Sequence, residues 1–362
     1  MFYLFVVALV TLAGGFVLVL TQRIHGHWSL DTAFGVQNHH TAPTPRVGGV
    51  AVIVGALVGW CLADVSVRAI LEPILWASLP AFVFGLAEDL SKNIGVLPRL
   101  LATMFSGIVF WSLTGIAMQH TGVPPVDWVL GFSPFAVVFT AFAVGGVANS
   151  VNIIDGFNGL ASGAVIIMLA ALGGLACQVG DFPFALTCAT LIACILGFMA
   201  LNWPFGKIFL GDGGAYLLGF LLACLAVLLP MRNPGVSGLA TLVVCFYPVL
   251  EVMLSVLRRR RREGHHPGQP DKVHLHHLLH RRLVCQCVPG LSPALKNGLT
   301  SPLCWVFVAF PAIWVQFFYG HKGLLVVGLL IVWVGYSIIY YRLSQFRWGL
   351  VFFKSGFSFV LH

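Results

Sequence analysis

The sequence predicts an all-α integral membrane protein with ten or eleven transmembrane helices, and three observations support this prediction. Of its 362 residues, 59% are hydrophobic and 9% are charged, a composition that excludes a soluble enzyme with a large polar surface. Apolar runs long enough to cross a bilayer, roughly 17–25 residues, recur along the whole chain. The basic residues between these runs fall almost entirely on alternate loops, the pattern of a protein that keeps them on one side of a membrane.

The apolar runs are predicted to be helices, because backbone groups in lipid must be hydrogen-bonded within their own segment. They lack the alternation of apolar and polar residues that is typical of barrel strands. The first run is interpreted as a retained helix, since no basic segment and no convincing cleavage site accompany it. The eleven expected helices cover residues 2–22, 47–63, 73–87, 100–118, 128–148, 160–178, 183–201, 214–230, 237–257, 302–319 and 323–341.

The charged residues predict the orientation of the chain. One set of alternate loops, with the C-terminus, carries all 20 Lys and Arg residues except Arg68, Arg232 and Lys322. Positive residues stay in the cytoplasm, so we expect a periplasmic N-terminus, a cytoplasmic C-terminus and a multi-pass protein of the bacterial inner membrane. The formal net charge of +8 is then explained by the membrane, and no nucleic-acid partner is expected.

The domain organisation is predicted to be simple. Residues 1–345 are expected to form one polytopic domain with a cytoplasmic His- and Arg-rich loop at 258–300. Residues 346–362 mix basic and aromatic side chains and are expected to lie along the inner membrane interface. The cytoplasmic loops also hold the unusual acids, amides and histidines, so the active site is expected on that face.

Two of these loops suggest phosphate binding and carboxylate chemistry. In "NHHTAPTPRVGG" (38–49), Arg46 precedes a helix N-terminus, a position that suits a phosphate; a membrane-edge arginine beside lipid headgroups is the alternative. In "GLAEDLSKN" (85–93), Glu88 and Asp89 are adjacent acids that repel each other unless a cation such as Lys92 or a divalent ion lies nearby. A solvated helix end would also explain this pair.

Two further loops suggest a metal site built from oxygen ligands. In "NSVNIIDGFNGLASG" (149–163), polar residues recur at a spacing of three and would share one face if the segment is helical. In "NWPFGKIFLGDGGAYLLG" (202–219), Asp212 is surrounded by glycines that allow close backbone approach. Asp and Asn oxygens suit Mg²⁺, which keeps waters and substrate phosphates in its shell. The polar residues of the first loop are Asn149, Asn152, Asp155 and Asn158.

The fifth stretch, "RRRRREGHHPGQPDKVHLHHLLHRR" (258–282), concentrates histidines and arginines. Zinc binding by His274, His276 and His277, or by His276 with His280, is one interpretation, although no Cys or acid completes a tetrahedral site. A basic loop lying against headgroups is a second. An anion site that binds a diphosphate is the third. Together the five loops indicate a metal–diphosphate site for phosphoryl transfer, in which the protein positions groups and neutralises charge.

The five stretches, in this order, resemble the polyprenyl-phosphate N-acetylhexosamine-1-phosphate transferases of the MraY/WecA superfamily over roughly residues 20–345. "PDKVHLHHLL" is similar to the WecA-like branch, glycosyltransferase family 4, and Asn158 stands where MraY has Asp. The resemblance implies transfer of HexNAc-1-phosphate from a UDP-N-acetylhexosamine to undecaprenyl phosphate, with release of UMP. Such a reaction starts a lipid-linked surface glycan, for which O-antigen is a plausible product, and uses Mg²⁺, with Mn²⁺ as a substitute.

The resemblance also implies residue roles. Asn152 and Asp212 match the Mg²⁺ ligands, while Asp89, Glu88 and Asp155 match catalytic acids. The phosphate- and nucleotide-binding set comprises Arg46, Lys92, Asn149, Asn158, His274, His276 and His277. Glu88 replaces an Asp of many relatives, so the identity of the base stays open. Also open are the sugar (GlcNAc, GalNAc, QuiNAc or FucNAc), a homodimer, and the alternatives of a phospho-MurNAc-pentapeptide transferase or a transporter.

Overall fold

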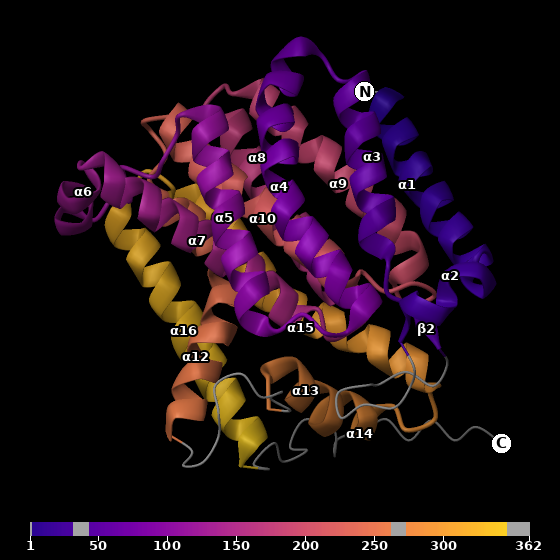
Figure 1. Cartoon of the computed structure of the whole chain (residues 1–362). Helices are drawn as coiled ribbons and strands as arrows, with labels where there is room; N and C mark the ends of the chain where they lie inside the picture. The colour runs from indigo at the N-terminus through magenta and orange to yellow at the C-terminus, as the bar shows by residue number, and fades with distance from the viewer. Residues whose placement is uncertain (1, 32–42, 262–272, 346–362) are drawn as a thin grey trace.

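The structure is a computed structural model that describes residues 2–31, 43–261 and 273–345, and it is almost entirely helical (Figure 1). Three sequence features lie partly or wholly outside the described residues. They are the start of the 38–49 stretch, residues 262–272 of the 258–300 loop and the predicted interfacial tail 346–362.

The elements follow one another as a chain of helices with one two-residue pair of strands. They are α1 (Phe2–Leu20), α2 (Gln22–Ser29), β1 (Leu30–Asp31), β2 (Thr44–Pro45), α3 (Gly48–Leu62), α4 (Val65–Ser91), α5 (Val96–Thr114), α6 (Pro124–Leu130), α7 (Ser133–Ile154), α8 (Leu160–Gln178), α9 (Phe182–Asn202), α10 (Gly211–Arg232), α11 (Gly238–Val244), α12 (Phe246–Arg261), α13 (Leu275–Leu279), the π-helical turn η1 (His280–Val284), α14 (Cys285–Cys287), α15 (Pro293–Phe318) and α16 (Lys322–Ser344).

Each predicted apolar segment coincides with a helix or a bent helix pair. Among the described residues, nine helices are long and apolar enough to cross a membrane, and α11 and α12 form a further span bent by 73°. The remaining segment, α3, has 15 residues, about 22 Å at 1.5 Å per residue, which is shorter than a hydrocarbon core of roughly 30 Å. The chain is an all-α, multi-pass membrane protein.

Several expected helix boundaries were wrong; the helix expected at 302–319, for example, is α15 and begins at Pro293. The segment expected at 73–87 is part of the 27-residue helix α4, which continues through Pro73 and Pro80. Packed membrane helices tolerate proline because neighbouring groups satisfy the freed backbone. The segment expected at 128–148 starts inside the short helix α6, and the long helix α7 begins only at Ser133 with Pro134 in its first turn, where proline costs no hydrogen bond.

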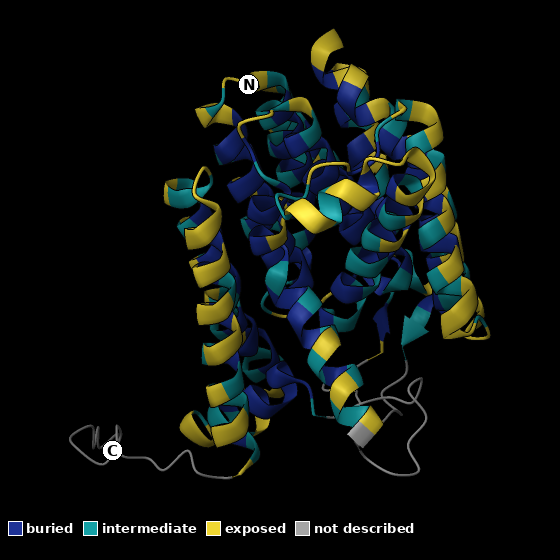
Figure 2. Ribbon diagram, turned by 90° about the vertical axis from the view of Figure 1, so that its left-hand side faces the viewer, coloured by how far each residue is buried: buried dark blue, intermediate teal, exposed yellow. Residues whose placement is uncertain are grey.

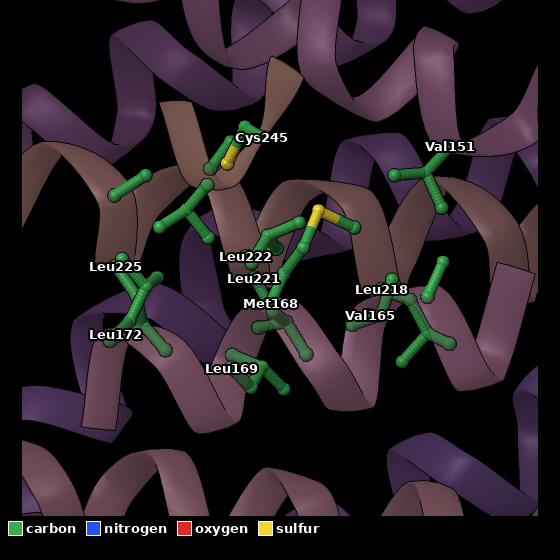
Figure 3. Close-up of a cluster of buried hydrophobic side chains, with 14 of the residues drawn as sticks. Val151, Val165, Met168, Leu169, Leu172, Leu218, Leu221, Leu222, Leu225 and Cys245 are labelled. Atoms are coloured by element: carbon green, nitrogen blue, oxygen red, sulfur yellow. The ribbon is translucent and has the colours of Figure 1, made fainter. Parts of the chain in front are cut away.

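The core is organised around α10, whose residues from Gly213 to Pro230 are all buried. A helix that is apolar on every side has to lie inside the protein. Figure 3 shows Leu218, Leu221, Leu222 and Leu225 of α10 facing a row of apolar side chains from α8. This helix therefore sets the position of any residue at its own N-terminus.

The outer helices carry the opposite pattern. In Figure 2 the exposed residues lie on the outside of the bundle and the buried ones inside. Large apolar side chains such as Phe5 of α1, Phe105 of α5 and Ile331 of α16 are among those exposed. Apolar exposure on this scale is not stable in water, so this surface faces lipid.

Glycines bring three helices together at the polar end of the bundle. A Cβ atom on Gly49 of α3 would lie 2.5 Å from Cα of Gly214, and one on Gly85 of α4 would lie 2.6 Å from Cα of Gly213. These distances are too short for any side chain, so the glycines around Asp212 serve close helix packing. As a result the start of α10 lies against the start of α3 and the end of α4.

Candidate active site

Asp212 lies in the first turn of α10 and is the centre of a charged cluster. Its Oδ1 accepts hydrogen bonds from Arg46, at 3.2 Å, and from Nδ2 of Asn152, at 3.1 Å. Its Oδ2 pairs with the guanidinium of Arg99. A carboxylate is also stabilised at a helix N-terminus by the helix dipole. Asp212 and Asn152, predicted as one site from segments 60 residues apart, are brought together.

Asp89 fixes the start of α10. Its side chain is 1% exposed, and its two oxygens accept hydrogen bonds from the backbone N–H groups of Asp212, at 2.8 Å, and Gly213, at 2.9 Å. Gly211 has φ of +76°, and a Cβ there would lie 2.5 Å from Asp89 Oδ2. Only glycine allows this approach, so the Gly-Asp-Gly sequence lets Asp89 cap the helix.

The neighbouring acid Glu88 has a separate environment. Its Oε2 accepts a hydrogen bond from the backbone N–H of Ile94 at 2.6 Å, at the end of α4. Lys92, predicted to touch phosphate, has a left-handed backbone with φ of 55°, and its Nζ donates to the carbonyl of Leu30 at 3.1 Å. The two acids that the sequence presents as a pair therefore have different partners, and Lys92 lies against β1.

Among the described residues, acids outnumber cations around Asp212. Arg46 lies 3.6 Å from Asp89 and 3.8 Å from Asp31 as well as contacting Asp212. Burial raises the pKa of Asp155 to about 7; Arg46 opposes this shift, and the carboxylates of Asp212 and Asp89 reinforce it. Ionised carboxylates with too few cationic partners favour protonation or the binding of a further cation.

The cluster fits a magnesium ion by its chemistry. Asp212 supplies a carboxylate, Asn152 a neutral amide group and Asp155 a second nearby acid, and hard divalent cations prefer oxygen ligands. No group of three His, Cys, Asp or Glu side chains in the described part of the chain forms a preformed metal site. Mg²⁺ does not require one, because it usually takes one or two carboxylates and completes its shell with water and substrate phosphate.

The asparagine-rich stretch forms a single helical face only in part. Asn149 and Asn152 lie on α7, but the helix ends at Ile154, so Asp155 and Asn158 belong to the following turn. The helix stops here because Gly156 and Gly159 follow, and Gly159 has φ of +77°. Asn149 donates to Thr103 at 2.9 Å and to its own helix at 2.8 Å, so its amide ties α7 to α5.

Asn158 is 6% exposed and anchors the turn to other helices. Its Nδ2 donates to the carbonyl of Pro204 at 3.0 Å, and its backbone N–H donates to Oδ1 of Asn297 at 2.7 Å. Ser301 donates to its carbonyl at 2.6 Å. The residue expected to contact a nucleotide thus makes three hydrogen bonds within the protein, which position the turn after Asp155.

The histidine segment lies next to the same turn. His276 Nε2 is 3.1 Å from the point that a Cβ on Gly156 would occupy, and His277 Cε1 is 4.0 Å from it. The rings of His274 and His276 are parallel, with centroids 5.3 Å apart. The structure therefore brings the histidines close to Asp155, as the proposal of one convergent site requires.

The zinc interpretation is not supported by this geometry. His280 Nδ1 is 2.9 Å from Thr300 Oγ1, and its Nε2 is 3.5 Å from Cys285 Sγ, so both ring nitrogens already have partners. His274 and His276 stack face to face at an interplanar angle of 8°. In the described part of the chain, these histidines form no group of three candidate metal ligands.

Sequence reasoning missed Arg99 and did not connect Glu251 with the site. Arg99 was counted among the inner basic residues but pairs with Asp212 from the first turn of α5. Its isolated position at the start of an apolar helix was an available signal. Glu251, a buried acid on α12, contacts His274 at 2.8 Å.

Part of the chain matches a known protein family. Residues 72–230, which include Asp89, Asn152, Asp155 and Asp212, match the family model described as "Glycosyl transferase family 4". Over this range the chain is similar to glycosyl transferase family 4. The match supports the family expected from the five sequence stretches.

Curated relatives of the chain carry transferase names. It is 28% identical over 250 residues to the undecaprenyl-phosphate alpha-N-acetylglucosaminyl 1-phosphate transferase of Yersinia pestis, covering 68% of each chain. The enzyme of the same name from Escherichia coli K12 is 26% identical over 250 residues, covering 68% of this chain and 67% of the relative. The decaprenyl-phosphate N-acetylglucosaminephosphotransferase of Mycobacterium leprae is 29% identical over 286 residues, covering 68% and 70%.

Proposed function

We propose that the protein transfers HexNAc-1-phosphate from a UDP-N-acetylhexosamine to undecaprenyl phosphate, giving undecaprenyl-diphosphate-HexNAc and UMP. The observation that carries this proposal is the cluster around Asp212, in which acids, an amide and two arginines from five separate segments meet at one end of an apolar helical bundle. The names of the relatives support the same substrates.

The bond changes follow from the substrates. An oxygen of the lipid phosphate attacks the β-phosphorus of the nucleotide sugar, the bond from that phosphorus to the bridging oxygen breaks, and the α-phosphate leaves as UMP. The sugar keeps its bond to the transferred phosphate. A phosphate monoester has its second pKa near 6, so the nucleophile is already largely deprotonated at neutral pH. Positioning and charge neutralisation then contribute more than a general base.

Asp212 and Asn152 would hold Mg²⁺, with Asp155 beside them. A bound Mg²⁺ neutralises developing charge on the phosphates. Arg46 and Arg99, which pair with Asp212 here, are close enough to bind the phosphate oxygens that enter the cluster. Asp89 holds the N-terminus of α10 in place, and the histidine segment covers the site from the side of Gly156.

We further propose that this end of the bundle faces the cytoplasm of a bacterial inner membrane. The described Lys and Arg residues are concentrated at this end, and positive residues are retained on the cytoplasmic side. UDP-sugars are cytoplasmic metabolites, so this orientation gives the site access to its donor. The lipid product would start a surface glycan such as O-antigen.

A reconstitution assay tests the function. Purified protein in lipid nanodiscs is incubated with undecaprenyl phosphate, Mg²⁺ and one of a panel of UDP-sugars, including UDP-GlcNAc, UDP-GalNAc and UDP-MurNAc-pentapeptide. Mass spectrometry of the lipid product identifies the sugar, and UMP release is measured separately. A diphosphate-linked HexNAc supports the proposal; exclusive use of UDP-MurNAc-pentapeptide supports the rival transferase, and turnover of no donor refutes both.

A matched pair of variants ties the activity to the site. Asp212→Asn should abolish transfer, whereas Asp64→Asn should leave it unchanged. Asp64 is an exposed aspartate that precedes α4 at the opposite end of the bundle and makes no capping hydrogen bond. Normal turnover by the Asp212 variant would refute the assignment of this cluster.

A further inference from the structure

Glu251 is a fully buried acid outside the Asp212 cluster. It lies on α12 with 0% exposure, and three groups from two other segments donate to it. Oε1 accepts from His274 Nδ1 at 2.8 Å and from the backbone N–H of Leu275 at 3.2 Å. Oε2 accepts from the hydroxyl of Tyr336 on α16 at 2.6 Å. Both carboxylate oxygens of Glu251 therefore have hydrogen-bond partners.

Keeping a carboxylate here is expensive unless its partners are well placed. A buried acid loses its hydration and needs hydrogen bonds or an opposite charge in return. Two apolar side chains would join α12 to α16 at lower cost, so packing alone does not explain this acid. The arrangement instead gives Glu251 a specific partner, His274.

The contact fixes the chemistry of His274. A carboxylate oxygen accepts, so His274 Nδ1 must carry the proton, and Nε2 is the nitrogen on the opposite edge of the ring. A second hydrogen bond at one ring nitrogen commonly sets the tautomer and orientation of a working histidine. The adjacent bond from Leu275 holds the backbone at the start of α13, so both the ring and its helix are fixed by one acid.

Ring contacts link the fixed side chain of His274 to the site. Its ring stacks on His276 at 5.3 Å and 8°, and the His276 and His277 rings are 4.5 Å apart. His276 in turn lies against Gly156, next to Asp155. A continuous path of contacts therefore runs from α16 through Glu251 and the histidines to the turn beside Asp212.

We propose that Glu251 and Tyr336 are positioning residues that set the ring of His274, and with it the histidine segment, for binding the diphosphate of the nucleotide sugar. The inference rests on the proposed function, because it assigns the bound diphosphate to that substrate. Neither residue touches the diphosphate; both act through His274.

The chain offers a matched pair of tyrosines for the test. Tyr336 and Tyr247 are both 0% exposed, and both rings pack near Phe307. Tyr247 lies one turn before Glu251 on α12, and its hydroxyl lies near Cys304 of α15 and donates no hydrogen bond to Glu251. Tyr336→Phe removes a donor to Glu251, whereas Tyr247→Phe removes a hydroxyl of equal burial outside the network.

The kinetic prediction separates positioning from general loosening. Tyr336→Phe should raise KM for UDP-GlcNAc about ten-fold, the scale of one lost hydrogen bond to a charged group, with KM for undecaprenyl phosphate unchanged. Glu251→Gln should lower kcat/KM for UDP-GlcNAc further. Tyr247→Phe should behave like the wild type. Equal losses for both substrates, or equal effects of the two tyrosine changes, would overturn the proposal.

A double-mutant cycle tests whether Glu251 acts through His274. In a His274→Ala background, Glu251→Gln should cause less than a two-fold further loss, because residues that act as one unit are not additive. Full additivity would show that Glu251 works by another route. The Tyr336→Phe variant provides the same comparison if Glu251→Gln fails to fold.

A ligand-free measurement keeps the inference separate from the proposed function. Hydrogen–deuterium exchange of peptides covering 273–284 should be faster in Tyr336→Phe and Glu251→Gln than in wild type or Tyr247→Phe. Unchanged exchange in these variants would refute the positioning role. Wild-type protein that turns over no UDP-sugar but shows the exchange effect would instead refute the proposed function alone.

Discussion

Asp89 at the end of α4 accepts a hydrogen bond from the backbone N–H of Asp212 at 2.8 Å, across 123 positions of sequence. The two aspartates therefore have different tasks; Asp89 was expected to be a catalytic acid and Asp212 a Mg²⁺ ligand. Asp212 presents its side chain to Arg46, Asn152 and Arg99, whereas Asp89 uses both oxygens on the N-terminus of α10. This division predicts how their neighbours respond to substitution.

Asp89→Asn should be far more damaging than Glu88→Gln. An amide has only one acceptor oxygen, so Asp89→Asn loses one of the two N–H contacts and the pairing with Arg46. We expect at least a hundred-fold loss of transfer and a lower thermal midpoint, since a buried donor is left without a partner. Glu88→Gln keeps an oxygen for Ile94 and should lose less than about ten-fold. Transfer assays with thermal unfolding measure both; equal losses would identify Glu88 as the base.

Removing Arg99 should change the response to magnesium. Arg99→Ala takes a positive charge away from Asp212, so the half-saturating Mg²⁺ concentration should fall about five-fold, the scale of one partly screened charge a few ångströms away. The maximal rate should also fall, because a phosphate-binding group is lost. Magnesium titrations of UMP release check both effects. Arg68→Ala, at the opposite end of the bundle, is the control, and an increased magnesium requirement in Arg99→Ala would contradict the prediction.

Gly85→Ala should disrupt the crossing of α4 and α10. The new Cβ would lie 2.6 Å from Cα of Gly213, and backbone cannot move aside without shifting Asp212. We expect about 1–3 kcal/mol of destabilisation, as for other overpacked sites, together with loss of transfer. Gly335→Ala on α16 meets nothing within 4 Å and should be neutral or slightly stabilising. Normal activity in Gly85→Ala would show that the crossing is looser than described.

Asp155 predicts a pH dependence of stability. Burial raises its pKa from 3.8 to about 7, so the folded protein binds a proton more tightly than the unfolded chain. This contribution is complete below about pH 4 and is lost as the pH rises through about 7. The thermal midpoint of magnesium-free wild-type protein should therefore fall across this range relative to Asp155→Asn. Parallel pH profiles of the two proteins would contradict the prediction, and Asp64→Asn should follow the wild type.

The sequence predicted the helical segments well because lipid imposes a strong constraint on composition and length. The prediction was wrong at positions where the lipid does not determine the structure. The expected segment started at Pro73, yet α4 begins at Val65 and passes through both Pro73 and Pro80. Residues 128–132 are apolar but belong to α6 and a turn, since their packing and not their hydropathy separates them from α7.

The site was predicted as a set of segments more successfully than as a set of contacts. Asp212 and Asn152 meet as expected. Asn158, however, donates hydrogen bonds to Pro204 and Asn297. Lys92 donates one to the carbonyl of Leu30. Such assignments depend on which partner lies across the bundle, which local spacing does not encode. Arg99 illustrates the same limit, because nothing near it in sequence indicates Asp212.

The burial of Asp89 has a consequence for how the protein is made. The N–H group of Asp212 that donates to Asp89 is synthesised 123 residues later. At usual translation rates of 5–20 residues per second, this delay is about 6–25 s. Until α10 enters the membrane, a carboxylate near the end of α4 has no helix to cap. Biogenesis must therefore keep the early helices loosely associated, and a nascent chain truncated before Gly211 should be a substrate for membrane proteolysis.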